Sequence, residues 1–259
     1  MPWLSTEIRG TTRVLTLDNP GRRNAVPADG WIALGAALSD FEASDDRVLI
    51  VTGANGDFCA GADLSPERLA SNPSIVAHRD RMKAVAATAM RLHRLTKPTI
   101  AAVDGVAVGA GLNLALGCDV VLASDAARFS EIFVRRGLTL DFGGSWLLPR
   151  VVGLQRAKEL ALSGREVAAD EALALGLCIE VTTPESLLAR ALELAESFAA
   201  QAPLGQMFAK QGIDHAWDHS FADAVDLEGQ SQAILLTTDD FAEGVTAFIE
   251  KRSPRFRGR

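Results

Sequence analysis

The chain has 259 residues, of which 48% are hydrophobic and 23% charged, so it can form one or two globular domains and is neither disordered nor a small disulfide-stapled protein. Its 26 basic and 33 acidic side chains give a formal net charge of −7. Such an acidic surface repels phosphate backbones, so nucleic-acid binding is not expected as the main function.

Short β-branched runs alternate with helical patterns in the first half of the chain. The patterns predict strands at residues 12–17, 48–51, 99–103 and 120–123, and helices at residues 29–41 and 75–95. This alternation of strand and helix favours an α/β fold with a parallel sheet.

Almost all of the chain after Gly143 has helical spacing. We expect helices at residues 146–148, 157–162, 169–175, 187–198, 205–217 and 221–249, and one last short strand at residues 179–181. The simplest organisation is an α/β core at residues 1–200. A helical region at residues 201–259 then belongs to the same functional unit and serves oligomerisation.

The three cysteines, Cys59, Cys118 and Cys178, are odd in number and far apart, which is typical of a reducing compartment and predicts a cytoplasmic protein. The first residues lack the apolar segment of a signal peptide. The longest uncharged apolar stretch, residues 105–118, is too short to cross a bilayer, so no membrane span is expected.

Three segments contain small residues that ordinary core packing does not require. Residues 59–64 follow a strand and a turn, and residues 104–113 pass from strand to helix. In both, small side chains let a ligand approach free peptide N–H groups. In the third segment, residues 137–146, Asp141 has apolar neighbours that favour a raised carboxyl pKa. Each segment alone is more often structural, and Asp141 alone fits a helix N-cap; their ordered combination is more specific.

In that order the segments resemble the crotonase, or enoyl-CoA hydratase/isomerase, superfamily. The likeness covers nearly the whole chain and is carried by residues 17–20, 23–25, 58–64, 104–113, 143–153 and 247–252. It implies a crotonase-like ββα spiral core with a helical C-terminal region that packs between subunits of a homotrimer or a dimer of trimers. It also implies an acyl-CoA thioester as the partner, with CoA as part of the substrate and no prosthetic group or metal.

The resemblance assigns an oxyanion hole for the thioester carbonyl to the peptide N–H groups of Ala62 and Ala110. The residues that would bind CoA or the acyl group are Arg23, Ala25, Ala60, Ala62, Asp63, Leu64, Gly109, Gly111, Asn113 and Phe133. Lys251, in a C-terminal stretch rich in basic residues, is a further candidate that would pair with a CoA phosphate across a subunit boundary. The simpler interpretation of this stretch is a solvated, partly disordered tail.

The acid/base residues decide between the branches of the family. Hydratases of this family carry two glutamates, and this sequence has Asn113 and Phe133 at the aligned positions. Neither side chain can act as a base, so ordinary hydratase activity is disfavoured. Asp141 instead matches the aspartate of the isomerases. We therefore expect an isomerase that shifts a double bond or rearranges a ring, with Asp141 moving a proton from C2 to C4 of an acyl group from lipid or aromatic degradation.

Several alternatives stay open. Glu131 would become the second carboxylate after a small alignment slip, since strand alternation puts it on one face with Phe133, and a hydratase with a non-standard base would result. Asp141 could attack an acyl-CoA as a nucleophile, as in a hydrolase or dehalogenase. A non-catalytic acyl-CoA binder is the third alternative.

Other chemistry-bearing residues favour structural roles. His215 and His219 lack a third ligand nearby and fit a solvated helix face rather than a metal site. Cys59 has no histidine near in sequence and fits a small buried thiol. A nicotinamide cofactor is not expected, because Gly109-x-Gly111 lacks the third glycine of a dinucleotide fingerprint.

Overall fold

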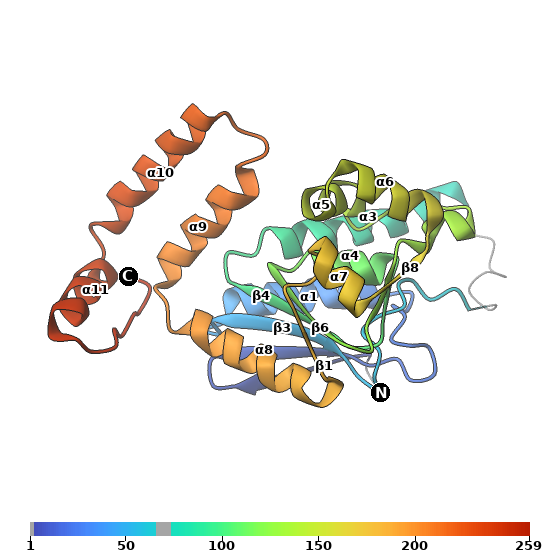
Figure 1. Cartoon of the computed structure of the whole chain (residues 1–259), viewed down its shortest axis with the longest axis horizontal. Helices are drawn as coiled ribbons and strands as arrows, with labels where there is room; N and C mark the ends of the chain where they lie inside the picture. Colours follow the sequence, from blue (N-terminus) through green and yellow to red (C-terminus); the bar gives the residue numbers. More distant parts are fainter. Residues whose placement is uncertain (1–2, 66–73) are drawn as a thin grey trace.

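The computed structural model describes residues 3–65 and 74–259, and its main feature is a twisted six-stranded sheet (Figure 1). The strands follow one another in the order β1 (Leu4–Arg9), β2 (Thr12–Leu17), β3 (Val48–Gly53), β4 (Thr99–Val103), β6 (Val120–Ser124) and β9 (Glu180–Thr182). β1 pairs with β2 in the antiparallel sense and every other pair is parallel. The predicted parallel sheet is therefore confirmed for five of these strands.

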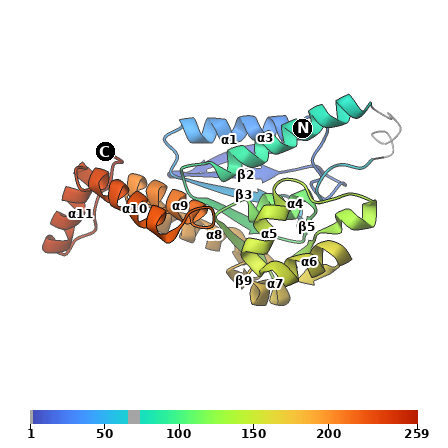
Figure 2. The ribbon, with the colours of Figure 1, turned by 90° about the horizontal axis from the view of Figure 1, so that it is seen from above.

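Helices cover both faces of this sheet. α8 (Pro184–Ala199) covers one face, where Leu187 and Ala191 pack against side chains such as Ile50 and Ile100. On the other face lie α1 (Gly30–Ala43), α3 (Ile75–His93) and α4 (Ala110–Leu116) (Figure 2). All seven residues of α4 are buried, which makes it the central helix of the fold. Among the described helices, none is long and apolar enough to cross a bilayer.

A second, three-stranded sheet lies beside α4. It contains β5 (Val106–Val108), β7 (Arg128–Ser130) and β8 (Glu166–Ala168). After β7 the chain forms the 3₁₀ helix η1 (Ile132–Arg136), and then α5 (Gly144–Val152), α6 (Leu154–Ser163) and, after β8, α7 (Ala169–Leu175). The segment between β7 and α5 carries Glu131, Phe133 and Asp141 of the candidate site.

The C-terminal helices form an arm that projects from the body (Figures 1 and 2). The arm contains α9 (Pro203–His215), α10 (Phe221–Leu235) and α11 (Asp239–Glu250). Neither α9 nor α10 has a buried residue, and the arm exposes large apolar side chains such as Trp217, Phe221 and Phe248. Helices of a single chain gain little stability from packing in this state.

The long predicted elements are confirmed within a few residues, with one exception. The predicted helix at residues 221–249 is two helices, because Thr238 caps a new one: its Oγ1 accepts a hydrogen bond of 3.1 Å from Phe241 N–H. The sequence patterns did not predict β1, nor the three-residue strands of the small sheet.

Candidate active site

Two segments far apart in the sequence lie side by side at the N-terminal end of α4. Cys59 forms an isolated parallel bridge with Ala107. Cys59 N–H donates to Val106 O at 2.8 Å, and Val108 N–H donates to Cys59 O at 3.0 Å. This pairing brings residues 59–62 against residues 107–110.

Glycines make the close approach of these segments possible. Gly61 has a φ of +82°, and a Cβ built on it would lie 2.8 Å from Val108 O and 3.4 Å from Ala110 N. A Cβ on Gly111 would lie 2.1 Å from Cys59 O. Gly109, with a φ of +57°, turns the chain into α4. Side chains at Gly61 and Gly111 would push the two segments apart.

Two peptide N–H groups remain available where the segments meet. Within residues 3–65 and 74–259, neither Ala62 N–H nor Ala110 N–H donates a hydrogen bond to a protein acceptor. Ala62 is exposed, and a Cβ built on the residue before it, Gly61, would lie 3.4 Å from Ala110 N. Adjacent unpaired N–H donors can stabilise the oxygen of a thioester carbonyl. The structure thus brings together the segments of the two residues that the family resemblance assigns to an oxyanion hole.

The predicted CoA-binding edge, which consists of residues 23–25 and 60–64, adjoins this pair of donors. Ala60 N–H donates to Arg23 O at 2.9 Å, Val26 N–H to Gly61 O at 2.7 Å, and Asp63 N–H to Val26 O at 3.0 Å. These bonds hold residues 23–26 beside residues 60–63. Ala25 is buried in the edge and Leu64 is exposed beyond it.

Residues 23 and 24 have left-handed backbone, with φ values of 48° and 56°. The Asn24 side chain fixes this turn, because its Nδ2 donates to Ala54 O at 2.8 Å and to Asp57 O at 2.6 Å. The Arg23 side chain remains 69% exposed and lies 3.9 Å from the Asp57 carboxylate. A guanidinium so exposed can approach a ligand phosphate.

Asp141 lies in the turn before α5. The turn is tight, with φ values of 49° at Phe142 and 84° at Gly143, and Gly144 N–H donates to Asp141 O at 2.9 Å. Asp141 Oδ1 is buried and has no hydrogen-bond partner in the described chain. Removal from water raises the pKa of this carboxyl group from 3.8 to about 6. The N-cap of α5 is Gly143, with no side-chain cap, so the N-cap interpretation of Asp141 is wrong.

Asn113 connects Asp141 to α4. The side chain is completely buried, and its Nδ2 donates to Asp141 O at 3.0 Å and to Glu131 Oε2 at 3.4 Å. Because a main-chain carbonyl oxygen can only accept, the amide nitrogen must face Asp141 O. Gly144 packs against the same amide, since a Cβ there would lie 2.3 to 2.6 Å from its atoms.

Glu131 and Phe133 are both buried, but not through strand alternation. Glu131 is the N-cap residue of η1 and Phe133 lies in its first turn, so the predicted strand at this point is wrong. The Phe133 ring lies 3.5 Å from where a Gly109 Cβ would be, which places it beside the oxyanion segment. Glu131 is 1% exposed, and desolvation raises its carboxyl pKa to about 8. The sequence indicates Glu131 only as an alternative to Asp141 as the catalytic carboxylate, and the structure shows that it is buried beside Asn113.

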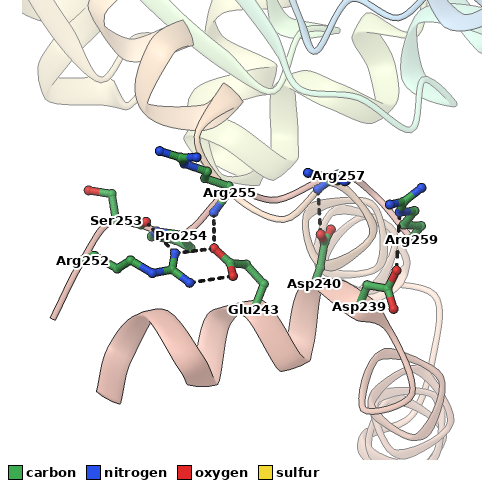
Figure 3. A pocket seen from close by; sticks show the side chains of 9 residues that line it. All are labelled: Asp239, Asp240, Glu243, Arg252, Ser253, Pro254, Arg255, Arg257 and Arg259. Carbon is green, nitrogen blue, oxygen red and sulfur yellow. Dashed lines mark hydrogen bonds and ion pairs between the residues drawn. The ribbon is translucent and has the colours of Figure 1, made fainter. Parts of the chain in front are cut away.

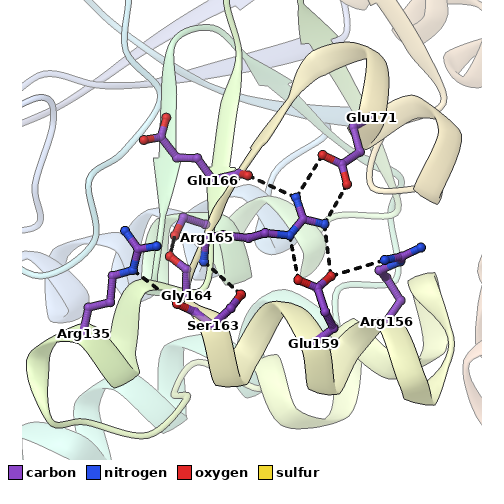
Figure 4. Close-up of polar contacts among 9 residues, drawn as sticks. Arg135, Arg156, Glu159, Ser163, Gly164, Arg165, Glu166 and Glu171 are labelled. Atoms are coloured by element: carbon purple, nitrogen blue, oxygen red, sulfur yellow. Dashed lines mark hydrogen bonds and ion pairs between the residues drawn. The ribbon is translucent and has the colours of Figure 1, made fainter.

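The segment around η1 is held from behind by polar contacts. Ser130 Oγ donates to Gly164 O at 2.9 Å, and Arg135 Nε donates to Ser163 O at 3.2 Å. Next to them Arg165 pairs with Glu159 of α6 and Glu171 of α7, each at 2.7 Å (Figure 4). These contacts fix the position from which Glu131 reaches Asn113.

Lys251 is not brought to the site within one chain. It is the C-cap residue of α11, the last helix of the arm, which projects away from the body of the molecule (Figures 1 and 2). The basic stretch after it is an ordered segment that folds back on α11 (Figure 3). There Arg252 pairs with Glu243, and the N–H groups of Arg257 and Gly258 donate to Asp240 at 2.6 and 2.8 Å. The bonded part of this stretch is therefore not disordered, whereas its residues are mostly exposed, as expected of a solvated tail.

The other candidates have structural positions. Cys59 is buried, and desolvation raises its thiol pKa to about 12, so it is no nucleophile at neutral pH. His215 and His219 contact each other with ring centroids 5.6 Å apart. In the part of the chain that the structure describes, no group of three or more His, Cys, Asp or Glu residues could hold a metal ion.

The α/β core, its small second sheet and the C-terminal helices are the arrangement of crotonase-fold proteins. The family model for enoyl-CoA hydratase/isomerase matches residues 7–259, and the chain belongs to this family. A crystal structure of an enoyl-CoA hydratase from Bacillus anthracis has a TM-score of 0.94 at 30% identity and covers 99% of this chain and 100% of that chain. The predicted family and fold class are thereby confirmed.

Relatives named for different activities have similar sequence identity to this chain. The chain is 37% identical to the 1,2-epoxyphenylacetyl-CoA isomerase of Escherichia coli (strain K12), with 100% of both chains covered. It is 36% identical to the 2,3-dehydroadipyl-CoA hydratase of the same strain, with 95% of each covered. Overall identity therefore does not separate isomerase from hydratase, and the site residues must do so.

Proposed function

We propose that this protein is an acyl-CoA isomerase that shifts a double bond, or rearranges a ring, in an enoyl-CoA thioester. The observation that carries the proposal is the set of groups around Asp141. Its carboxyl group is half-buried with a pKa of about 6, so it is mostly ionised at pH 7 and still basic enough to accept a proton. Asn113 and Phe133, at the positions of the two hydratase glutamates, cannot activate a water molecule.

The reaction needs one base and two N–H donors. Asp141 removes a proton from C2 of a 3-enoyl thioester, and the negative charge moves onto the thioester oxygen. The N–H groups of Ala62 and Ala110 stabilise this dienolate. Asp141 then returns the proton at C4, the double bond lies between C2 and C3, and no atoms are gained or lost. A donor of this kind contributes about 10²- to 10³-fold to kcat, and a base about 10²- to 10⁴-fold.

The CoA portion of the substrate is assigned to the edge formed by residues 23–25 and 60–64, with Arg23 as a phosphate ligand. We further propose a homotrimer or a dimer of trimers, in which the exposed apolar side chains of the arm contact a neighbouring subunit. Lys251 would then approach a CoA phosphate from the neighbouring copy. The three unpaired cysteines fit a cytoplasmic enzyme.

The test is double-bond migration in a panel of 3-enoyl-CoA esters of different chain length, together with a ring epoxide of an arylacetyl-CoA. Wild-type protein should isomerise at least one of them, and Asp141→Asn should lower kcat by about 10²- to 10⁴-fold. Ser44→Ala, which removes a partly buried hydrogen bond to Phe41 O at the C-cap of α1, is the control and should keep its kcat. Full turnover by Asp141→Asn would refute the assignment.

A hydratase with Glu131 as its base is the second candidate, favoured by the buried Glu131 carboxyl group beside Asn113. Hydration of crotonyl-CoA that is faster than isomerisation and is lost in Glu131→Gln would support it. A covalent adduct on Asp141, found by mass spectrometry, would instead indicate nucleophilic attack. Tight CoA-ester binding without turnover, unaltered by Asp141→Ala, would indicate a binding protein.

A further inference from the structure

Three buried acceptor atoms without partners lie in the group of side chains around Asn113. Asn113 Oδ1, Glu131 Oε1 and Asp141 Oδ1 each have no hydrogen-bond partner in the described chain. Acceptors buried in this way destabilise a protein unless a proton or a ligand satisfies them. The proposed reaction uses Asp141 and leaves the Glu131 carboxyl group without a role.

Glu131 has no cation to balance a negative charge. Among the described residues no Arg, Lys or His forms an ion pair with it, and the charged group that affects it is Asp141, another acid. Its one hydrogen-bond partner is the Asn113 amide. An unpaired carboxylate that is 1% exposed is strongly disfavoured, so the group takes up a proton instead. A raised pKa of about 8 agrees with this neutral state.

The Asn113 amide connects Glu131 to the catalytic turn. Its two N–H bonds go to Glu131 Oε2 and Asp141 O, and the Asp141 turn has unfavourable left-handed backbone at Phe142. A residue with this backbone keeps its conformation only where its surroundings hold it. Loss of the Glu131 acceptor would free the amide to rotate away from Asp141 O.

We propose that Glu131 is a positioning residue: a neutral carboxyl group that orients the Asn113 amide and, through it, holds the Asp141 turn in its active conformation. The neutral state matters as well as the contact. A second carboxylate in this site would oppose the ionisation of Asp141, which must be an anion to accept a proton. This inference rests on the proposed function only in taking Asp141 as the base.

Two substitutions separate the positioning role from a direct acid/base role. Glu131→Gln keeps the size and an acceptor oxygen but cannot ionise, so it should retain most of the wild-type kcat. Glu131→Leu removes the acceptor and should lower kcat by about 10- to 100-fold with little change in KM, because a displaced base loses rate rather than binding. A Glu131→Gln enzyme as slow as Asp141→Asn would overturn the proposal, and so would a Glu131→Leu enzyme as fast as wild type.

The coupling to Asn113 distinguishes positioning from a general loss of packing. In a double-mutant cycle, Asn113→Ala combined with Glu131→Leu should be no slower than the slower single variant, since both break the same connection. Additive losses would contradict the inference. Ser44→Ala is the control, because it removes a partly buried hydrogen bond to Phe41 O at the C-cap of α1 without touching Asn113, Glu131 or Asp141. It should lower the melting temperature and leave kcat unchanged.

The wild type and the variants should be compared by the rate at which they exchange the C2 hydrogen of a saturated acyl-CoA for deuterium in D2O. This exchange requires proton abstraction at C2 but no double bond in the substrate. If exchange occurs without isomerisation, the proposed function fails and the Glu131 variants still give an answer. Infrared spectroscopy needs no substrate. A carboxylic acid C=O band of wild-type protein at pH 7 that is missing in Glu131→Gln is expected. Absence of this band from the wild type would overturn the neutral state.

Discussion

The Asn113 side-chain amide donates a hydrogen bond of 3.0 Å to the main-chain oxygen of Asp141. Asn113 lies in the first turn of α4, three residues after Ala110. One bond therefore joins the helix that begins with an oxyanion donor to the turn that carries the acid. A carboxylate at residue 113 would face the Asp141 oxygen without a donor, so the amide suits this architecture better than glutamate does.

The pH dependence of turnover should follow the ionisation of Asp141. Burial raises its pKa to about 6, and the anion is the active form. We expect kcat/KM to be constant above about pH 7 and to fall about tenfold per pH unit well below pH 6. A profile measured in constant-ionic-strength buffers checks this. A falling limb near pH 4 instead would mean that the carboxyl group is solvated when substrate is absent.

The same raised pKa should make the wild type less stable than its neutral variant. The folded state favours protonated Asp141, so ionisation destabilises folding as the pH rises from 3.8 through about 6. Asp141→Asn should therefore have the higher melting temperature at pH 8 and no such advantage near pH 3. Calorimetry at both pH values tests the sign. Equal melting temperatures at pH 8 would contradict it.

Gly144→Ala should damage the catalytic turn. The added Cβ would fall 2.3 to 2.6 Å from atoms of the Asn113 amide, which is itself wedged against Glu131 and Asp141. We expect destabilisation of about 1–3 kcal/mol and a reduced kcat, measured by urea unfolding and turnover. Gly212→Ala in α9 is the control, since nothing lies within 4 Å of its added Cβ. Wild-type kcat in Gly144→Ala would show that the turn tolerates displacement of the amide.

Gly111→Ala should separate the two oxyanion segments. The new Cβ would lie 2.1 Å from the main-chain oxygen of Cys59, a backbone atom that cannot move aside alone. Loss of one N–H donor costs about 10²- to 10³-fold in kcat, and binding of an enolate analogue should weaken in parallel. Isothermal titration with such an analogue, beside turnover, tests both effects. Reduced turnover with unchanged analogue affinity would contradict the assignment of Ala110 as a donor.

The arm should mediate assembly. Phe221 and Phe248 are 86% and 84% exposed in one chain, which is unfavourable for aromatic side chains of an isolated protein. Light scattering should give a mass of three or six times 27.5 kDa, and Phe248→Glu should reduce it. Leu162→Glu, on the body at α6, is the control because its side chain is 75% exposed. A smaller mass in Leu162→Glu alone would place the interface on the body.

The sequence predicts the main sheet well because its strands are buried and rich in β-branched residues, as at residues 48–51 and 99–103. It does not reveal β1, an edge strand whose alternating Glu7 and Arg9 are exposed to solvent. Three-residue strands such as β7 are too short for a period of two to be distinguished. Their existence depends on tertiary pairing rather than on local preference.

Within the site, the glycines could be recognised in the sequence as positions of close backbone approach, whereas the burial of Glu131 could not be predicted. The spacing of Gly61, Gly109 and Gly111 indicates a close backbone approach, which the structure contains. Glu131 resembles a surface carboxylate in any hydropathy pattern, since such groups are rarely buried. Only the fold reveals that its neighbours are Asn113 and the Asp141 turn.

Because α9 and α10 have no buried residue within one chain, the melting temperature of the arm should depend on the protein concentration. A helix pair that gains its apolar contacts from other copies is stabilised by mass action, whereas the sheet and its covering helices draw on contacts within one chain. Dilution should therefore melt the arm first, and the melting temperature of this part should fall as the protein concentration is lowered.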